Sequence, residues 1–325
     1  MTEKILVTGA AGFIASRICE LLLQQGAEVS GIDNINDIYD YRLKEYRLRK
    51  LEMEPGFHFV RGDITDFESL TDLFEKGRFN ACINIAGVPG VRLSMADPWL
   101  YLRTNTEGTL NLLEQCRRHD VPKFIQASTS SIYGADAPFP TSEEASSDKP
   151  LQPYSASKKG AEAECHAYHY LYDMDVTIFR FFTVYGPAGR PDMAMYRFIR
   201  WITEGEPIQL NGDGEQTRGF TYVDDIARGC ILGLKPVGYE IMNLGGHESI
   251  SINDLIAKLE TIIGKKAIVH HNPVVKADML ANLADISKAR GILGWNPQVD
   301  LDEGLRLTAN WYQENRDWLK EIRLS

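Results

Sequence analysis

The opening of the chain combines two kinds of hydrophobic pattern. Residues 4–8 and 28–32 are short, β-rich apolar runs, and the first of them ends at Gly9. Between them, apolar side chains in residues 14–25 recur three or four positions apart, the spacing of one helix face: Ile14, Ile18, Leu21 and Leu22. The pattern therefore predicts a strand, a glycine-rich turn, a helix and a second strand.

The same alternation continues to about residue 181. Further strand-like runs lie at 58–61, 81–85, 123–127 and 176–181, and helical stretches lie at 67–76, 99–118 and 154–172. Alternating strands and helices favour an α/β fold, here a Rossmann-type doubly wound parallel sheet. The less regular pattern from residue 183 onward predicts a smaller α/β C-terminal substrate lobe.

Composition narrows the range of partners. The 325 residues carry 35 Lys and Arg against 45 Asp and Glu, which gives a formal net charge of −10. No basic field attracts nucleic acid or an anionic membrane, so we expect neither as a partner. Five scattered cysteines are typical of buried thiols in a reducing compartment. No apolar run reaches the length of a signal peptide or membrane span, so we expect a cytoplasmic location.

The segment 9–15 between the first strand and helix has the pattern of a dinucleotide-binding turn. Gly9 permits the tight turn, Gly12 lets a pyrophosphate approach the backbone, and the small Ala15 permits close packing of helix on strand. The helix that follows presents free N–H groups to phosphate, and we include its first residues, Phe13 and Ile14, in the cofactor site.

Acidic residues at the ends of later strands complete this predicted cofactor site. Asp33 ends the second strand about 20 residues after the glycines, where a carboxylate binds a ribose 2′-hydroxyl and repels the 2′-phosphate of NADP. The cofactor is therefore predicted to be NAD. Asp63, after the third strand, is expected near the adenine. The neighbouring positions Asn34, Ile64 and Ala86 belong to the same predicted site.

Tyr154 and Lys158 form the candidate catalytic pair. Their four-residue spacing at the start of a helix places both on one face. A phenol with a pKa near 10 is a poor base at neutral pH, and lowering that pKa to about 7 takes roughly 4 kcal/mol. A nearby ammonium and a positively charged nicotinamide supply stabilisation of that kind. Thr129 or Ser128, at the end of the 123–127 run, would hydrogen-bond the same substrate hydroxyl.

These motifs together resemble the extended short-chain dehydrogenase/reductase superfamily, in its nucleotide-sugar branch. The resemblance covers nearly the whole chain and rests on the glycine-rich turn, residues 128–134, the Tyr154–Lys158 pair and residues 218–225. Within that branch, residues 33–44, 90–105 and 180–194 are most similar to the UDP-glucuronate 4-epimerases. Ala15 and Gly219 depart from that pattern, where the family mostly has Gly and Asp.

The resemblance implies an NAD-dependent epimerisation of a UDP-sugar. Tyr154 acts as acid and base at the sugar 4-hydroxyl, and NAD is regenerated in each cycle. A uronic acid passes through a β-keto acid, whose carboxylate must be restrained to prevent loss of carbon dioxide. The residues expected to bind substrate are Arg92, Ser128, Thr129, Ser130, Tyr154, Thr183, Arg190 and Arg218, with Arg218 at the diphosphate.

The resemblance also implies an arrangement of domains and subunits. Residues 1–182 are expected to form the NAD-binding Rossmann domain, rejoined by about 222–246, and residues 183–325 mainly the nucleotide-sugar-binding lobe. A homodimer is expected through a four-helix bundle built from the stretches 99–118 and 154–172.

Three other functions remain open from the sequence. A decarboxylase of the UDP-xylose type shares the oxidation step, but it usually carries an acidic residue where this chain has Ser130. A 4-epimerase of a neutral UDP-hexose shares all of the motifs. A catalytically inactive NAD sensor usually lacks the Tyr or the Lys that this chain retains. No metal is expected, because the histidine pairs 166/169 and 270/271 lack further ligands at suitable spacing.

Overall fold

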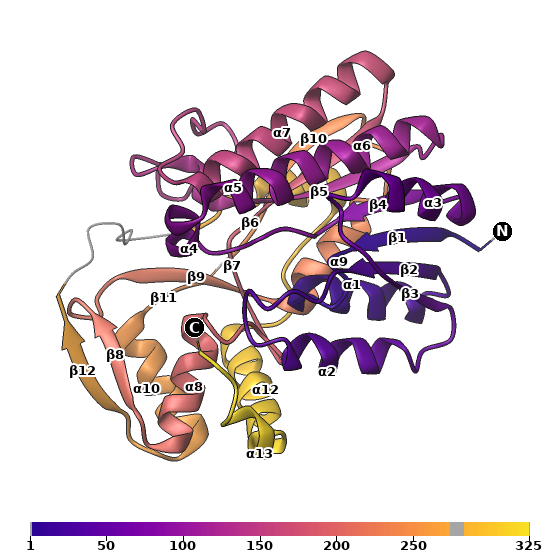
Figure 1. The fold of residues 1–325 in the computed structure, drawn as a ribbon. Coiled ribbons are helices and arrows are strands. Elements are labelled where there is room, and N and C mark those ends of the chain that lie inside the picture. The colour runs from indigo at the N-terminus through magenta and orange to yellow at the C-terminus, as the bar shows by residue number, and fades with distance from the viewer. Residues whose placement is uncertain (1, 247, 274–282, 325) are drawn as a thin grey trace.

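A seven-stranded parallel sheet forms the centre of the molecule (Figure 1). The computed structural model describes residues 2–246, 248–273 and 283–324. The strand order is β3-β2-β1-β4-β5-β6-β10, and every neighbouring pair is parallel. Its strands are β1 (Lys4–Thr8), β2 (Glu28–Asp33), β3 (Phe57–Arg61), β4 (Ala81–Asn84), β5 (Lys123–Thr129), β6 (Asp175–Phe181) and β10 (Tyr239–Leu244).

Helices cover both faces of this sheet, because its strands are apolar on both sides. In β1, Ile5 and Val7 pack into one hydrophobic cluster and Leu6 into another, as the two-residue period of a strand requires. One face carries α3 (Phe67–Gly77), α6 (Gly108–Arg118) and α7 (Pro153–Tyr172), and the other carries α1 (Phe13–Gln24), α9 (Val223–Leu232) and α11 (Ser287–Leu293) (Figure 1). The predicted doubly wound α/β fold is confirmed.

The strand order reverses between β1 and β4, and this point positions the candidate site. The chain runs outward from β1 through β2 and β3 on one side, then returns to build β4, β5 and β6 on the other. In sheets of this kind, ligands bind beyond the carboxyl ends of the strands at such a switch point. The glycine-rich turn after β1 and the polar end of β5 therefore face the same crevice.

Two helical segments differ from the sequence expectation. The stretch predicted as a single helix over 99–118 consists of α5 (Pro98–Tyr101), a π-helical turn η1 (Leu102–Glu107) and α6. Helix α2 (Arg42–Leu51), which the hydrophobic pattern did not predict, packs beside α1. Short helices α4 (Val91–Ala96) and η2 (Ser130–Tyr133) follow the ends of β4 and β5.

A smaller lobe is built mainly from the second half of the chain (Figure 1). It has a three-stranded sheet and a two-stranded sheet, while β10 returns to the central sheet within residues 222–246. The domain boundaries themselves stay a prediction. The lobe's elements are β7 (Thr183–Tyr185), α8 (Ala194–Glu204), β8 (Pro207–Asn211), β9 (Thr217–Tyr222), β11 (Ser249–Ser251), α10 (Ile252–Ile263), β12 (Ile268–Asn272), α12 (Leu301–Glu314) and α13 (Arg316–Leu319).

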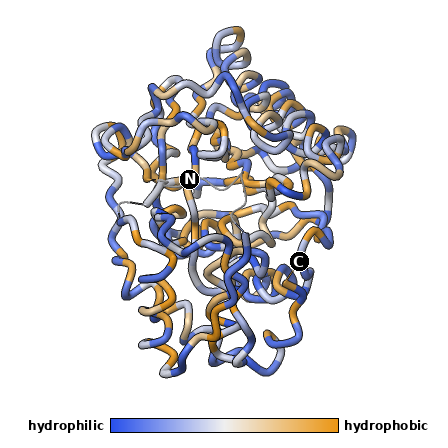
Figure 2. The backbone as a smooth tube through the Cα atoms, turned by 90° about the vertical axis from the view of Figure 1, so that its left-hand side faces the viewer, coloured by the Kyte–Doolittle hydropathy of each residue, from blue (hydrophilic) through white to orange (hydrophobic). Residues whose placement is uncertain are grey.

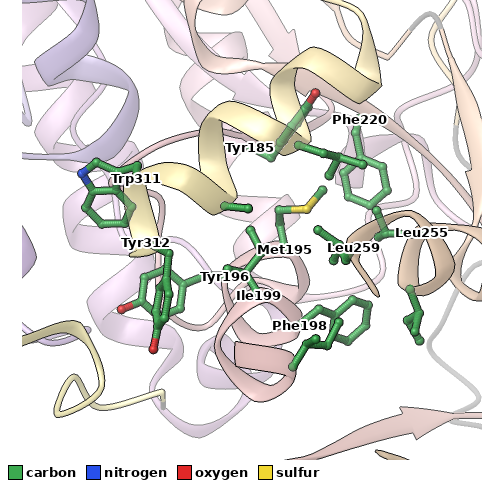
Figure 3. Packing of buried hydrophobic residues seen from close by; sticks show 14 of the residues in the cluster. Tyr185, Met195, Tyr196, Phe198, Ile199, Phe220, Leu255, Leu259, Trp311 and Tyr312 are labelled. Atoms are coloured by element: carbon green, nitrogen blue, oxygen red, sulfur yellow. The ribbon is translucent and has the colours of Figure 1, made fainter. Parts of the chain in front are cut away.

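This lobe has its own hydrophobic core. Met195 and Ile199 of α8 pack with Leu255 and Leu259 of α10, and Tyr312 of α12 closes the cluster (Figure 3). Hydrophobic and hydrophilic residues are interleaved along the trace of the chain (Figure 2). Within the described ranges, no helix is long and apolar enough to span a membrane.

Candidate active site

The tight turn after β1 can form only because Gly9 and Gly12 lack side chains. Gly9 has a φ of 68°, and a Cβ there would lie 2.9 Å from the Cα of Ala86. The Gly12 N–H donates to the Gly9 carbonyl at 2.7 Å, and a Cβ on Gly12 would lie 2.8 Å from that oxygen. Helix α1 begins at the next residue, Phe13, with no cap from a described side chain and no acidic residue in its first turn. This bare cradle at a helix N-terminus fits a pyrophosphate.

Asp33 lies beside the turn, at the carboxyl end of β2. Its Oδ2 accepts the Ala11 N–H at 3.2 Å, and its Oδ1 accepts the Ile35 N–H at 2.8 Å. The buried Lys44 ammonium, contributed by α2, lies 3.5 Å from Oδ1. The carboxylate is therefore fixed next to the cradle, where a ribose hydroxyl could reach it.

Asp63 lies at the end of the neighbouring strand. The Asn34 side chain donates to its Oδ2 at 2.7 Å, and the Thr65 N–H and hydroxyl donate to its Oδ1. Burial opposes ionisation of Asp63, but these hydrogen bonds lower its pKa. Ile64 is buried, with its side chain against the backbone of Gly108. Asp33, Asn34, Asp63 and Ile64 thus line one side of the predicted adenosine site, and their contacts with NAD stay predictions.

The candidate catalytic pair lies in the first turns of α7. Gln152 and Ser155 form a reciprocal capping box that fixes where this helix begins. Lys158, one turn after Tyr154, is buried and donates to the Ala127 carbonyl of β5 at 3.2 Å. Burial lowers the pKa of Lys158 to about 8. Its ammonium lies against Gly87, where a Cβ would come within 2.8 Å of Nζ.

The Tyr154 hydroxyl meets the end of β5. Burial raises the pKa of Tyr154, while its hydrogen bond with Thr129 and the positive charge of Arg190 act in the opposite direction. A hydroxyl, a phenol and a guanidinium thus converge here from β5, α7 and the loop between β7 and α8. Such a group can exchange a proton with a substrate hydroxyl and hold an anion nearby.

Arg190 belongs to the loop that joins β7 to α8. Its guanidinium forms a two-pronged ion pair with Asp192, with an Nη2–Oδ2 distance of 2.5 Å. Burial lowers the pKa of Arg190, but the neighbouring Asp192 carboxylate raises it further, so the net shift is upward. Arg190 also lines a small cavity of about 20 Å³ together with Phe13, Gly186 and Gly189. This cavity joins the loop to the start of α1.

The other predicted substrate residues are spread more widely. Thr183 begins β7 and is partly exposed, as is Ser130 at the start of η2. Arg92 is exposed on α4. Arg218 lies in β9, where its guanidinium donates to the Thr217 carbonyl at 2.8 Å. None of these four residues is tested as a substrate ligand by the geometry, so their roles stay predictions.

Ser128 is engaged in a buried network. Its hydroxyl donates to Glu162 Oε1 at 2.6 Å, and Glu162 also forms a two-pronged ion pair with Arg180 at 2.8 and 2.9 Å. Burial raises the pKa of Glu162, but Arg180 more than compensates, so the carboxylate stays charged. A substrate contact from Ser128 would compete with this bond. The Thr129 hydroxyl also has partners, since it accepts the Ser131 N–H and donates to the Ser131 hydroxyl, both at 3.2 Å, but it is the one that meets Tyr154.

Three residues near the site received no role from the sequence. Asn105, in the π-helical turn, donates to Ser157 and accepts the Val88 N–H at 2.8 Å. The Tyr101 ring stands edge-on to Tyr154, with centroids 6.0 Å apart. Arg47 of α2 contacts both the glycine turn and the Arg190 loop. A polar Asn within an amphipathic stretch was the available signal for the first of these, since π-turns are frequent at functional sites.

The histidine pairs 166/169 and 270/271, considered above as metal ligands, contact aromatic rings or the backbone. His166 and His169 contact the ring of Tyr239, and the His271 ring bonds the Gly212 carbonyl. Among the residues that the structure describes, no cluster of His, Cys, Asp and Glu could hold a metal ion.

Comparison with known proteins gives the family of this chain. A model of the "NAD dependent epimerase/dehydratase family" matches residues 5–245. This chain belongs to that family. As a member, it is 51% identical over 320 residues to a UDP-glucuronate 4-epimerase of Thermodesulfobacterium geofontis, an alignment that covers 98% of this chain and 99% of that protein.

Solved structures extend the likeness to the whole fold. The UDP-glucuronic acid 4-epimerase of Bacillus cereus, in complex with UDP-glucuronic acid and NAD, is 39% identical with a TM-score of 0.90, covering 96% of this chain and 99% of the other. The UDP-glucose 4-epimerase of Thermotoga maritima, with UDP-glucose, is 30% identical with a TM-score of 0.89, over 96% and 99% of the two chains.

Proposed function

We propose that this chain interconverts UDP-glucuronate and UDP-galacturonate through a transient 4-keto sugar, with NAD as its resident cofactor. The observation that carries the proposal is the placement of Tyr154, hydrogen-bonded to Thr129 and one turn before the buried Lys158, beside the bare glycine cradle. The relatives support the substrate, since a protein 51% identical to this chain is named a UDP-glucuronate 4-epimerase and a solved structure 39% identical to it holds UDP-glucuronic acid and NAD.

Tyr154 moves the proton in the proposed cycle. Its phenolate accepts the proton of the sugar 4-hydroxyl and later returns a proton to the 4-oxygen, while Thr129 holds that oxygen in line. Lys158 stabilises the phenolate from one helical turn away. NAD, held by the glycine turn and Asp33, would supply the redox chemistry, with hydride passing from carbon 4 to the cofactor and back to the opposite face of the ketone. Turnover of the sugar between these events inverts carbon 4.

Arg190 is proposed to restrain the sugar carboxylate. The 4-keto uronate is a β-keto acid, which loses carbon dioxide when its carboxylate C–C bond aligns with the ketone. A guanidinium near Tyr154 can hold that carboxylate in another orientation by two parallel hydrogen bonds. Thr183 and Ser130 are proposed as further donors, Arg92 as a second cation for this region, and Arg218 as the ligand of the diphosphate.

The cofactor half of the site is proposed to bind NAD through the strand ends. Gly9, Gly12 and the first turn of α1 at Phe13 and Ile14 would hold the pyrophosphate, and Asp33 the ribose hydroxyls. Asn34, Asp63, Ile64 and Ala86 would line the rest of the dinucleotide, with Lys158 reaching the nicotinamide ribose. A charged Asp33 favours NAD over NADP, because it repels a 2′-phosphate.

A product analysis tests this function. We expect the purified protein to convert UDP-glucuronate into UDP-galacturonate, identified by NMR, without addition of NAD. Stoichiometric release of carbon dioxide would instead show a decarboxylase, and equally fast conversion of UDP-glucose would show a neutral-sugar epimerase. If the protein binds NAD but leaves every UDP-sugar unchanged, it is a sensor and the proposal is wrong.

We further propose that two copies pair through the helices α6 and α7, which lie side by side with α5 (Figure 1). Large apolar side chains are exposed on the segments next to these helices: Leu93, Met95, Trp99 and Leu102. Light scattering should give the mass of a dimer. Leu102→Glu should yield monomers, while Leu232→Glu, on the other face of the sheet and similarly exposed, should leave the mass unchanged. A monomeric parent protein would contradict this assembly.

A cytoplasmic location is the last part of the proposal. All five cysteines are free and buried, as expected of a protein that folds in a reducing compartment. Fractionation of cells that express the full chain would test it.

A further inference from the structure

The buried side chain of Arg47 connects two parts of the molecule that are far apart in sequence. From α2, its Nη1 donates to the Ala11 carbonyl of the glycine turn at 3.1 Å and to the Tyr39 hydroxyl at 2.9 Å. Its Nε and Nη2 donate to the Ala188 carbonyl at 2.9 and 2.6 Å, and Nη2 also reaches the Gly189 carbonyl at 3.4 Å. One guanidinium thus holds the cofactor turn and the loop before α8 together.

The chemistry of these partners is unusual for a buried cation. Every acceptor that Arg47 uses among the described residues is a carbonyl or a phenol oxygen, with no carboxylate to neutralise its charge. Only the planar fork of arginine can serve three segments at once, since lysine has three donors at a single point. An arrangement of this kind fixes the relative positions of those segments.

The loop that Arg47 holds is the one that carries Arg190. Ala188 adopts a φ of 54°, a left-handed conformation that costs a non-glycine residue free energy and persists only where its surroundings impose it. The two bonds from Arg47 to the Ala188 carbonyl are such a constraint. Arg190 follows two residues later, and its position relative to Tyr154 depends on the path of this loop.

We propose that Arg47 is a positioning residue that ties the Arg190 loop to the cofactor turn and thereby keeps the 4-keto uronate from losing its carboxylate. This inference rests on the proposed function. It concerns what happens to the intermediate after the first proton and hydride have left carbon 4, and it assigns Arg47 no contact with the substrate.

The side reaction that Arg47 suppresses has a defined balance. When the carboxylate aligns with the ketone, the bond between carbons 5 and 6 breaks and carbon dioxide leaves. The electron pair moves into the enolate of the 4-ketone, and carbon 5 then takes a proton from water. If the resulting 4-keto pentose escapes, the hydride is not returned, so each escape leaves one reduced cofactor on the enzyme.

The test compares Arg47→Met and Arg47→Lys with Arg17→Met. Arg17 is the control, because its side chain also bridges separate segments, pairing with Asp224 of α9 and with Glu20, but it is 27% exposed and none of these partners belongs to the Arg190 loop. For each variant, carbon dioxide released per epimerised sugar is measured, together with the near-ultraviolet absorbance of reduced nicotinamide during turnover.

We expect Arg47→Met to raise the ratio of carbon dioxide to epimer by about tenfold, as expected for displacement of a group that positions the reacting centre. Reduced cofactor should accumulate in parallel. Arg47→Lys should show a smaller rise, and Tyr39→Phe, which removes one acceptor while keeping the ring, a smaller rise still. Arg17→Met should keep the parent ratio.

Two results would overturn the inference. One is that Arg47→Lys and Arg47→Met release as little carbon dioxide per epimerised sugar as the parent protein, although they melt at a lower temperature. Arg47 would then be a purely structural residue. The other is an equal rise in Arg17→Met. If Arg47→Met does not fold, Arg47→Lys and Tyr39→Phe decide. Failure of the parent protein to epimerise UDP-glucuronate would refute the proposed function itself, and that result is distinguishable because it appears before any variant is made.

Hydrogen exchange gives a readout that does not depend on turnover. In the cofactor-free protein, amides of residues 186–190 should exchange faster in Arg47→Lys than in the parent, while those of α1 should not. Unchanged exchange in this loop would contradict the constraint that the proposal assigns to Arg47.

Discussion

The cofactor side and the sugar side of the candidate site are built in different ways. On the cofactor side, the predicted binding groups follow directly from the ends of parallel strands, as Gly9 does after β1, Asp33 at the end of β2 and Asp63 shortly after β3. On the sugar side, Arg190 lies on a loop that Arg47 holds from 141 residues away in sequence. The ends of the strands thus position the groups proposed for the redox step, and the Arg47 side chain holds the loop of the residue proposed to restrain the carboxylate.

Removing the Tyr154 hydroxyl should have the largest effect on turnover and should leave the Arg190 loop unchanged. Tyr154→Phe loses the acid–base group, and we expect kcat to fall by about 1,000-fold with little change in KM. Tyr170→Phe is the matched control, because Tyr170 lies on the same helix and is 79% exposed. Turnover of Tyr154→Phe within a few-fold of the parent would refute the assigned proton transfer.

Breaking the Glu162–Arg180 pair should destabilise the contact between helix α7 and strand β6 of the central sheet. Both side chains are at most 3% exposed, so Glu162→Gln leaves a buried cation with a neutral partner. We expect the free energy of unfolding to fall by about 3 kcal/mol in a denaturant titration. Glu114→Gln removes the more exposed pairs with Arg117 and Arg118 and should cost less than about 1 kcal/mol. An equal loss of unfolding free energy in Glu162→Gln and Glu114→Gln would show that burial does not make the Glu162–Arg180 pair more important for stability.

In the absence of cofactor, the buried charge of Lys158 should lower the free energy of unfolding. Because burial depresses the pKa of Lys158 to about 8, the folded state binds fewer protons than the unfolded state between about pH 8 and the ordinary lysine pKa of 10.5. The cost is therefore complete below pH 8 and fades as the pH rises toward 10.5.

Lys158→Met should accordingly lose activity but unfold with up to about 3 kcal/mol more free energy at pH 7. This gain should shrink between pH 8 and 10.5. The exposed Lys76→Met should change the free energy of unfolding by less than about 0.5 kcal/mol at every pH. A gain in Lys158→Met that grows with pH would contradict the depressed pKa.

Replacing Asp33 should give the smallest effect of the set. Asp33→Asn keeps the shape of the side chain but loses its charge, and we expect NAD to bind about tenfold more weakly, with the preference over NADP reduced. Calorimetric titration of both cofactors measures this. An unchanged ratio of NAD to NADP affinity would remove Asp33 from the ribose site.

The same contrast explains what could be predicted from the sequence. Some residues could be predicted because their role depends on local geometry. Gly9 and Gly12 mark a turn, Asp33 marks the end of a strand, and Tyr154 and Lys158 are one helical turn apart. The doubly wound fold followed from the alternation of patterns and is confirmed. The role of Arg47 could not be predicted from neighbouring residues, because Arg47 contacts the loop at Ala188 only in the folded chain.

Two further features have the same cause. The stretch 99–118 was expected as one helix, but residues Leu102–Glu107 form the π-helical turn η1, which the hydrophobic pattern of the sequence does not distinguish from an α-helix. The role of Ser128 as a substrate ligand stays a prediction, and nothing in the sequence indicated that its hydroxyl donates to Glu162, 34 residues away on α7. A pattern of polar residues does not reveal which hydroxyl will be engaged by such a partner.

The most direct test of the central claim follows the hydrogen at carbon 4. UDP-glucuronate deuterated at carbon 4 is incubated with the purified protein in ordinary water, and the product is examined by NMR and mass spectrometry. If a resident cofactor takes and returns the same hydride, UDP-galacturonate keeps the deuterium at carbon 4. Replacement of that deuterium by solvent hydrogen would contradict the account.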